Sequence, residues 1–289
     1  MYYEMPLYRP PSEAYSLIFQ VTLGCSHNQC AFCIMYRKKK FRIRPWEEFK
    51  ADILEAALAY RGINRVFLAD GDALVIDTDY MIQILDFLYE KFPSLERVSA
   101  YANPSNLLEK SEEDLQRIKK AGLQMLYFGI ETGDDELLVR IRKGATSQDL
   151  ITSAKKAIDA GFLLSATVIL GLAGKQGSER HALETARVCS AINPQYLSAL
   201  TLILEDDNRY FSRCLGKEWE MMDKLEILTE LRTMIEHFQL NNCIFRSNHA
   251  SNYLPIKATL NHDKEKLLQE IDNALKNPAQ LRPEFLRAL

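Results

Sequence analysis

Apolar runs that alternate with amphipathic stretches are the feature that most constrains the fold of this chain. Runs rich in β-branched and aromatic residues predict buried strands over 15–23, 65–69, 97–102, 125–131, 163–170 and 196–204. Apolar residues at three- and four-residue spacing predict helices between them, over 46–62, 79–92, 111–122, 147–161 and 178–192. The predicted strands recur at about thirty residues, the length of a strand with its crossover helix. We therefore predict an α/β fold with a parallel sheet, curved into a partial (βα)6 TIM-like barrel.

The alternation changes beyond residue 212. One long helix is predicted over 218–238, a strand-like run follows at 243–245, and a last helix is predicted over 263–275. We expect residues 1–212 to form the barrel core and residues 213–289 to form a C-terminal helical extension packed on it. Between these helices, the polar segment 246–257 has two interpretations, contact with a ligand or tight turns of structural origin.

Composition narrows the class of protein. The 289 residues are 47% hydrophobic, and the net charge of −3 gives no global reason to bind nucleic acid or a membrane. Residues 1–16 lack a basic stretch followed by an apolar one, and the longest apolar run, 162–174, is too short to span a bilayer. We therefore expect a cytoplasmic protein without membrane contact. Thiols stay reduced in that compartment, so clustered cysteines would be metal ligands or redox groups.

Three of the six cysteines, Cys25, Cys30 and Cys33, lie within nine positions directly after the first predicted strand. This is the rim where barrel enzymes build their active sites. Three thiolates can hold an iron–sulfur cluster, in which one iron stays open, or His27 can complete a zinc site. Structural zinc sites usually draw their ligands in pairs from separate segments, so the crowding favours the cluster and leaves zinc as the alternative.

The spacing Cys25-x4-Cys30-x2-Cys33, with the aromatic Phe32 before the last cysteine, resembles the radical S-adenosylmethionine (radical SAM) superfamily. The usual spacing of that family has one residue fewer in the first gap. The resemblance implies a [4Fe–4S] cluster whose open iron binds S-adenosylmethionine. It also implies an enzyme that cleaves this cofactor reductively and abstracts hydrogen from a substrate through a 5′-deoxyadenosyl radical.

The same resemblance implies cofactor-binding residues at the ends of later strands. They are Asp70, Gly71 and Asp72 after the second strand, Asn103 after the third, Glu131 at the end of the fourth, and Ile169 and Gly171 at the end of the fifth. Asp72 is the acid expected to bind the ammonium group of the cofactor, and Asp70 stands where the family usually has glycine. Glu205 follows the sixth strand on the same rim. No catalytic residue is assigned.

A basic run over 37–44 follows the cysteines. It can be a solvated loop, Arg42 or Arg44 can offset the negative charge of the cluster, or the basic run as a whole can dock an acidic electron donor such as flavodoxin or ferredoxin. Binding of an RNA backbone, as in an RNA-modifying radical SAM enzyme, is a further alternative.

Two features that the sequence lacks restrict the classes of reaction that we expect. No cobalamin-binding domain is recognised before residue 15, and no second cysteine cluster follows the first, because Cys189, Cys214 and Cys243 lie far apart and are predicted to be structural. Hydrogen abstraction from a small-molecule substrate is the expected chemistry.

Overall fold

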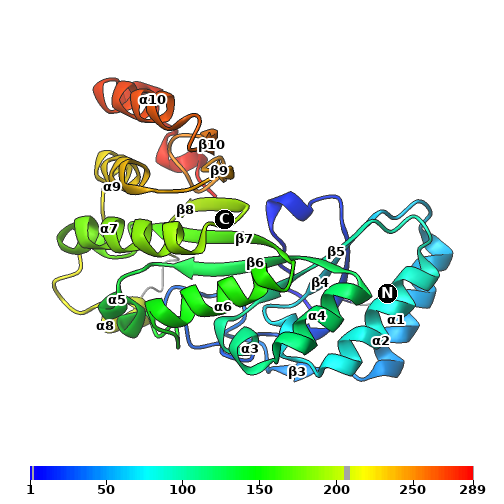
Figure 1. The fold of residues 1–289 in the computed structure, drawn as a ribbon. Coiled ribbons are helices and arrows are strands. Elements are labelled where there is room, and N and C mark those ends of the chain that lie inside the picture. Colours follow the sequence, from blue (N-terminus) through cyan, green and yellow to red (C-terminus); the bar gives the residue numbers. More distant parts are fainter. Residues whose placement is uncertain (2, 205–208, 289) are drawn as a thin grey trace. The chain divides into compact units, whose positions relative to one another are not determined.

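The computed structural model describes residues 1, 3–204 and 209–288 (Figure 1). Its strands form a mostly parallel sheet in the order β1-β4-β5-β6-β7-β8-β9-β10, and β2 and β3 form a separate pair. Strands β1, β4, β5, β6, β7 and β8 fall on the six predicted runs. The prediction of an α/β fold with an open, partial barrel is confirmed.

The chain divides into two compact units. The first comprises Met1–Gln29, Cys33–Phe128 and Thr152–Leu164, and the second comprises Cys30–Phe32, Gly129–Ile151 and Ser165–Leu289. The predicted boundary at residue 212 stays a prediction.

The first unit holds the early βα repeats. Its elements are η1 (Pro11–Glu13), β1 (Leu17–Gln20), β2 (Thr22–Leu23), β3 (Arg42–Ile43), α1 (Trp46–Ala59), β4 (Arg65–Ala69), η2 (Ala73–Val75), α2 (Thr78–Lys91), β5 (Arg97–Ala102), α3 (Pro104–Glu109), α4 (Glu112–Ala121) and most of β6 (Leu123–Glu131). Strand β4 is parallel to both β1 and β5, and its apolar residues are buried, as expected for a strand covered on both faces. The carboxyl ends of β1, β4 and β5 therefore lie at one edge of the sheet.

The second unit holds the later repeats and the C-terminal segment. Its elements are α5 (Asp135–Arg140), the start of α6 (Ser147–Asp159), most of β7 (Leu163–Leu170), α7 (Gly174–Ile192), β8 (Tyr196–Thr201), α8 (Arg209–Leu215), α9 (Lys224–His237), β9 (Cys243–Arg246), β10 (Lys257–Leu260), α10 (Lys264–Lys276), η3 (Pro278–Gln280) and η4 (Glu284–Leu286). Helix α9 packs against α7 and α10, and the three are seen together in Figure 1.

The C-terminal segment differs from the predicted helical extension in two respects. It contributes two strands to the sheet, since β9 pairs parallel with β8 and β10 pairs antiparallel with β9. Its long helix begins at Lys224 rather than 218, because Asp223 and Glu226 form a capping box that fixes the first turn. Among the described residues, the model contains no helix that combines the length and apolar character needed to cross a bilayer.

Candidate functional site

The cysteine loop, residues 24–41, connects β2 to β3, and these two strands pair antiparallel so that the ends of the loop are held together. Cys25, Cys30 and Cys33 form no disulfide bond and are partly exposed. Cys25 and Cys33 belong to the first unit. Cys30 belongs to the second, in which the next residue, Ala31, donates its N–H to the carbonyl of Ile141 at 2.7 Å.

The cysteines outside this loop are in different surroundings. Cys189 on α7 and Cys243 on β9 are buried, whereas Cys214 on α8 is half-buried. Burial raises the pKa of both buried thiols, that of Cys243 to about 12. These two thiols are therefore protonated at neutral pH, which agrees with a structural role.

Asp70, the first residue after β4, fastens the cysteine loop at both ends. Its carboxylate is fully buried and accepts the N–H of Gly24 at 3.0 Å and the ammonium of Lys39 at 2.9 Å. The Gln20 amide donates to the other oxygen at 3.1 Å. The N–H of Gly71 donates in turn to the carbonyl of Gly24 at 3.1 Å. The predicted cofactor motif and the start of the cysteine loop are thus one hydrogen-bonded structure.

Asp72 is also fully buried, and its carboxylate joins a second set of contacts near Cys25. The Ser26 hydroxyl and the Asn106 amide both donate to it. Burial raises the pKa of Asp72, while these hydrogen bonds act in the opposite direction. Asn103, predicted to bind the cofactor, donates its amide to the Cys25 sulfur at 3.8 Å. Asp72 and Asn103 therefore lie beside the first thiol of the loop.

Glu131 ends β6 in the second unit with φ of +63°, a left-handed conformation that residues other than glycine seldom adopt. Its carboxylate accepts the Lys143 ammonium at 3.0 Å, and both side chains are largely buried. Unusual backbone conformations cluster at functional sites, so this geometry supports the predicted role of Glu131.

Ile169 and Gly171, at the end of β7, are held by side chains from two helices. The carbonyl of Ile169 contacts Nε2 of His181 on α7 at 3.1 Å. The N–H of Gly171 donates to Glu230 of α9 at 2.7 Å. Gly171 has φ of +78°, and a β-carbon there would lie 2.6 Å from Cδ1 of Ile227, so only glycine fits.

His181 and Glu230 form a buried pair, with His181 Nε2 3.6 Å from the carboxylate. Burial lowers the pKa of His181 and raises the pKa of Glu230, and in each case the partner opposes the effect of burial. Ser178 also donates to Glu230 at 2.6 Å. Sequence analysis missed this pair because the two residues lie about 50 positions apart and match no motif.

Glu230→Ala should lower the free energy of unfolding by about 1–3 kcal/mol, because it leaves the buried N–H of Gly171 without an acceptor. Urea denaturation measures this difference. Glu236→Ala is the matched control, since Glu236 is exposed on the same helix and pairs with Arg232 at the surface. Equal losses for the two variants would contradict the anchoring role of Glu230.

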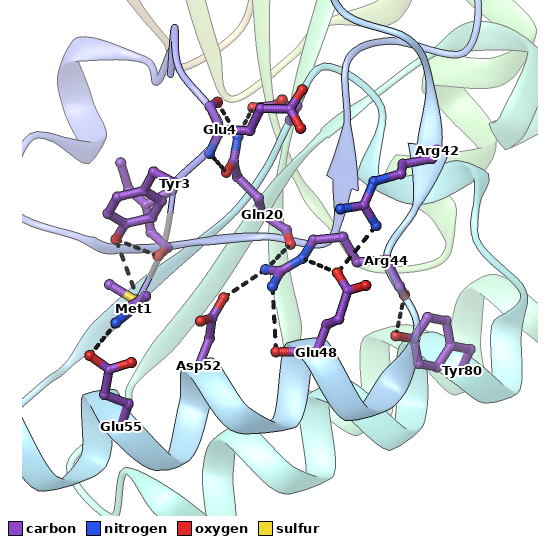
Figure 2. Close-up of polar contacts among 12 residues, drawn as sticks. Met1, Tyr3, Glu4, Gln20, Arg42, Arg44, Glu48, Asp52, Glu55 and Tyr80 are labelled. Atoms are coloured by element: carbon purple, nitrogen blue, oxygen red, sulfur yellow. Dashed lines mark hydrogen bonds and ion pairs between the residues drawn. The ribbon is translucent and has the colours of Figure 1, made fainter.

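Three residues of the basic run, Lys39, Arg42 and Arg44, pair with acidic groups of the protein. Arg44 is buried and donates to Asp52 at 2.7 Å, to Glu48 at 3.5 Å and to the carbonyl of Gln20 at 3.1 Å, as Figure 2 shows. Arg42 is exposed and reaches the same Glu48 at 3.2 Å (Figure 2). The charge of Arg44 is therefore committed to the fold, which disfavours it as a docking residue.

The polar segment 246–257 satisfies most of its hydrogen bonds within the second unit. Asn252 is buried, and its side chain makes two hydrogen bonds to β8. It accepts from Thr201 Oγ1 at 2.9 Å and donates to the carbonyl of Ala199 at 2.9 Å. Tyr253 donates to Glu284 near the C-terminus at 2.7 Å. These contacts favour the structural interpretation of this segment.

Two further observations bear on the predicted site. Within the part of the chain that the structure describes, no three His, Cys, Asp or Glu side chains are arranged to hold a single metal ion. Glu205, predicted to lie on the rim, falls outside the described residues.

Residues 19–186 match the family model described as the radical SAM superfamily, and this range includes the three cysteines. The chain belongs to the radical SAM superfamily. Enzymes of this superfamily use a [4Fe–4S] cluster and S-adenosylmethionine. Three reduced thiols on one fastened loop are a donor set that fits such a cluster.

Individual relatives are distant. The heme chaperone HemW of Bacillus subtilis is 23% identical over 151 residues, which cover 52% of this chain and 39% of HemW. The structure of coproporphyrinogen III oxidase HemN from Escherichia coli superposes with a TM-score of 0.59 at 18% identity, covering 76% of this chain and 51% of HemN. Methylornithine synthase PylB gives a TM-score of 0.54 at 18% identity, covering 78% and 63%. This chain thus spans less than two thirds of each of these proteins.

Proposed function

We propose that this protein is an enzyme that cleaves S-adenosylmethionine reductively and abstracts hydrogen from a small-molecule substrate. The observation that carries this proposal is the loop with Cys25, Cys30 and Cys33, which connects the paired strands β2 and β3 in a chain that belongs to the superfamily. We assign these three thiols as the ligands of a [4Fe–4S] cluster. Membership of the superfamily favours iron–sulfur over the zinc alternative with His27.

The cofactor would be held by the strand ends that follow the cysteine loop. We assign Asp72 and the backbone of Gly71 to the ammonium group of S-adenosylmethionine, with Asn103 beside them at the Cys25 sulfur. The carboxylate of Asp70 is already taken by Gly24, Gln20 and Lys39, so we assign Asp70 a contact through its backbone.

The remaining assignments are at the ends of β6 and β7. Glu131 is assigned to the ribose or the amino-acid end of the cofactor, and its carboxylate is oriented by Lys143. Ile169 and Gly171 are assigned to the adenine as the residues at the end of β7 that the family resemblance indicates. When bound, the cluster supplies one electron that breaks the carbon–sulfur bond of the cofactor, giving methionine and the 5′-deoxyadenosyl radical.

An assay for 5′-deoxyadenosine tests this function. The protein is reconstituted anaerobically with iron and sulfide, reduced with dithionite in the presence of S-adenosylmethionine, and compared with Cys30→Ala. We expect 5′-deoxyadenosine from the wild type and none from the variant. If the fully loaded wild type neither bound S-adenosylmethionine nor cleaved it, or if zinc alone filled the site, the proposal would be wrong.

The physiological electron donor is proposed to be an acidic protein such as flavodoxin or ferredoxin in the cytoplasm. Lys38 and Lys40 in the cysteine loop and Arg42 directly after it are exposed, and their positive charges favour an acidic partner. Replacing dithionite with reduced flavodoxin in the same assay tests this, and the rate should fall as ionic strength rises. Binding of RNA by the same lysines would instead appear as strongly salt-dependent RNA affinity.

A further inference from the structure

The hydroxyl of Tyr36 is a buried polar group without a hydrogen-bond partner among the described residues. Tyr36 lies three positions after Cys33 in the cysteine loop, and only 4% of it is exposed. Buried hydroxyls are normally paired, because an unmade hydrogen bond in the interior leaves the cost of desolvation uncompensated. An unpaired buried hydroxyl therefore indicates that a hydrogen-bond acceptor binds next to it.

The Tyr36 ring is held in place, so the hydroxyl cannot turn to another acceptor. Its backbone carbonyl accepts from the Asn28 amide and from the N–H of Lys39, both at 2.9 Å. The ring covers Gly71 so closely that a β-carbon there would lie 2.8 Å from Cδ2 of the tyrosine. The Tyr8 and Tyr36 rings also pack in a T-shaped contact, with their centroids 5.8 Å apart. Gly71 is therefore glycine because Tyr36 lies over it.

The groups around this hydroxyl indicate what would accept from it. Burial is the main cause that raises the pKa of Tyr36, and Tyr101, Asp70, Cys33 and Cys25 add to it. The hydroxyl is therefore protonated and able to donate at neutral pH. The Asp70 carboxylate already binds three donors. The sulfur atoms of Cys25 and Cys33 are the other acceptors. Sulfur is a weak acceptor as a thiol and a better one as a metal-bound thiolate.

We propose that Tyr36 donates a hydrogen bond to a sulfur atom of the [4Fe–4S] cluster or of its cysteine ligands, and that this bond raises the reduction potential of the cluster. The inference rests on the proposed function, because it requires a cluster at Cys25 and Cys33. A hydrogen bond to sulfur stabilises the reduced state more than the oxidised state, since the reduced cluster carries one more negative charge. Tyr36 is thus a positioning and tuning residue rather than a catalytic one.

Tyr36→Phe tests the proposal, since phenylalanine keeps the ring over Gly71 and removes only the hydroxyl. Tyr89→Phe is the matched control. The Tyr89 ring likewise covers a glycine, Gly122, and its hydroxyl donates to the Gly122 carbonyl at 2.8 Å. Both variants are reconstituted, their iron and sulfide content is measured, and the cluster is titrated anaerobically while its electron paramagnetic resonance signal is followed.

We expect Tyr36→Phe to load a full cluster whose reduction equilibrium is about tenfold less favourable, which is about 59 mV for one electron. The potential of Tyr89→Phe should equal that of the wild type. An unchanged potential in a fully loaded Tyr36→Phe protein would overturn the proposal. So would loss of the cluster from a folded Tyr36→Phe protein, because the hydroxyl would then be needed to hold the cluster. Failure of the wild type to load a cluster would contradict the proposed function instead.

The cluster-free proteins provide an independent measurement. Before reconstitution, Tyr36→Phe should melt at the same temperature as the wild type or higher, because the change removes an unpartnered hydroxyl. Tyr89→Phe should melt lower, since it loses an existing hydrogen bond. A cluster-free Tyr36→Phe protein that melts clearly below the wild type would show that the hydroxyl already has a partner within the fold, and the proposal would fail.

Discussion

Alanine at Cys25, Cys30 or Cys33 should lower the rate of 5′-deoxyadenosine formation at least about 100-fold. Changes to residues that only orient metal ligands cost about 10–100-fold, so loss of a ligand should reach or exceed the upper end of that range. In the proposed cluster each thiolate would hold one iron, so its loss would leave that iron without a protein ligand. Iron content and 5′-deoxyadenosine measured on the same reconstituted samples check the prediction.

Two controls separate this prediction from its alternatives. Cys214→Ala removes a half-buried thiol of α8, outside the cysteine loop, and should keep its iron and activity. His27→Ala removes the proposed fourth ligand of a zinc site but none of a three-cysteine cluster. Retention of the cluster by His27→Ala supports the cluster, whereas loss of all bound metal from this variant would support zinc. Full cluster content in Cys30→Ala would contradict the ligand assignment.

The sequence predicted the strands well because each βα unit carries its own local signal. The run at 65–69 is short, apolar and bounded by polar residues, and it coincides with β4. The cysteine loop could be placed on the rim for the same reason, since it follows β1 and β2 directly. The family resemblance, and not a known contact, indicated Asp70, Asp72 and Asn103 as cofactor-binding residues, and their positions at strand ends of a parallel sheet agree with a place near Cys25.

The contacts that the sequence did not predict all depend on partners distant along the chain. Glu230 looks like one more acid on an amphipathic helix, and only packing of α9 against α7 brings it to His181 and Gly171. The run at 243–245 was predicted to be strand-like but was not placed in the sheet, and β10 was not predicted as a strand, because it begins at the end of the polar segment 246–257. The start of α9 could have been found, because Asp223 and Glu226 have the spacing of a capping box.

The burial of Lys39 in the basic run could not be predicted from the sequence either. A charge run in a sequence indicates a solvated surface, and Lys38 and Lys40 are indeed exposed. Lys39, between them, is buried, because its partner Asp70 lies 31 positions away at the end of β4. No local pattern distinguishes the middle lysine from its neighbours.

Lys39→Met should lower the free energy of unfolding by about 3–5 kcal/mol, because methionine keeps the side-chain bulk but leaves the Asp70 carboxylate buried without its cation. Lys39 also donates to the carbonyl of Glu4 at 2.6 Å, and this bond is lost as well. Urea denaturation of the cluster-free protein measures the effect. Since Asp70 also holds Gly24, the variant should bind iron more weakly.

Lys38→Met is the matched control for this change. It alters the neighbouring residue in the same way on the surface, and surface substitutions usually change stability by less than about 0.5 kcal/mol. Asp70→Asn in the Lys39→Met background removes the stranded charge and should recover part of the lost stability, because a buried pair costs most when one partner remains. If Lys39→Met cost no more than Lys38→Met, the cysteine loop would not depend on the Lys39–Asp70 pair. The double variant could also recover stability but not iron binding. That result would show that the charge pair orients the loop for the cluster in addition to stabilising the fold.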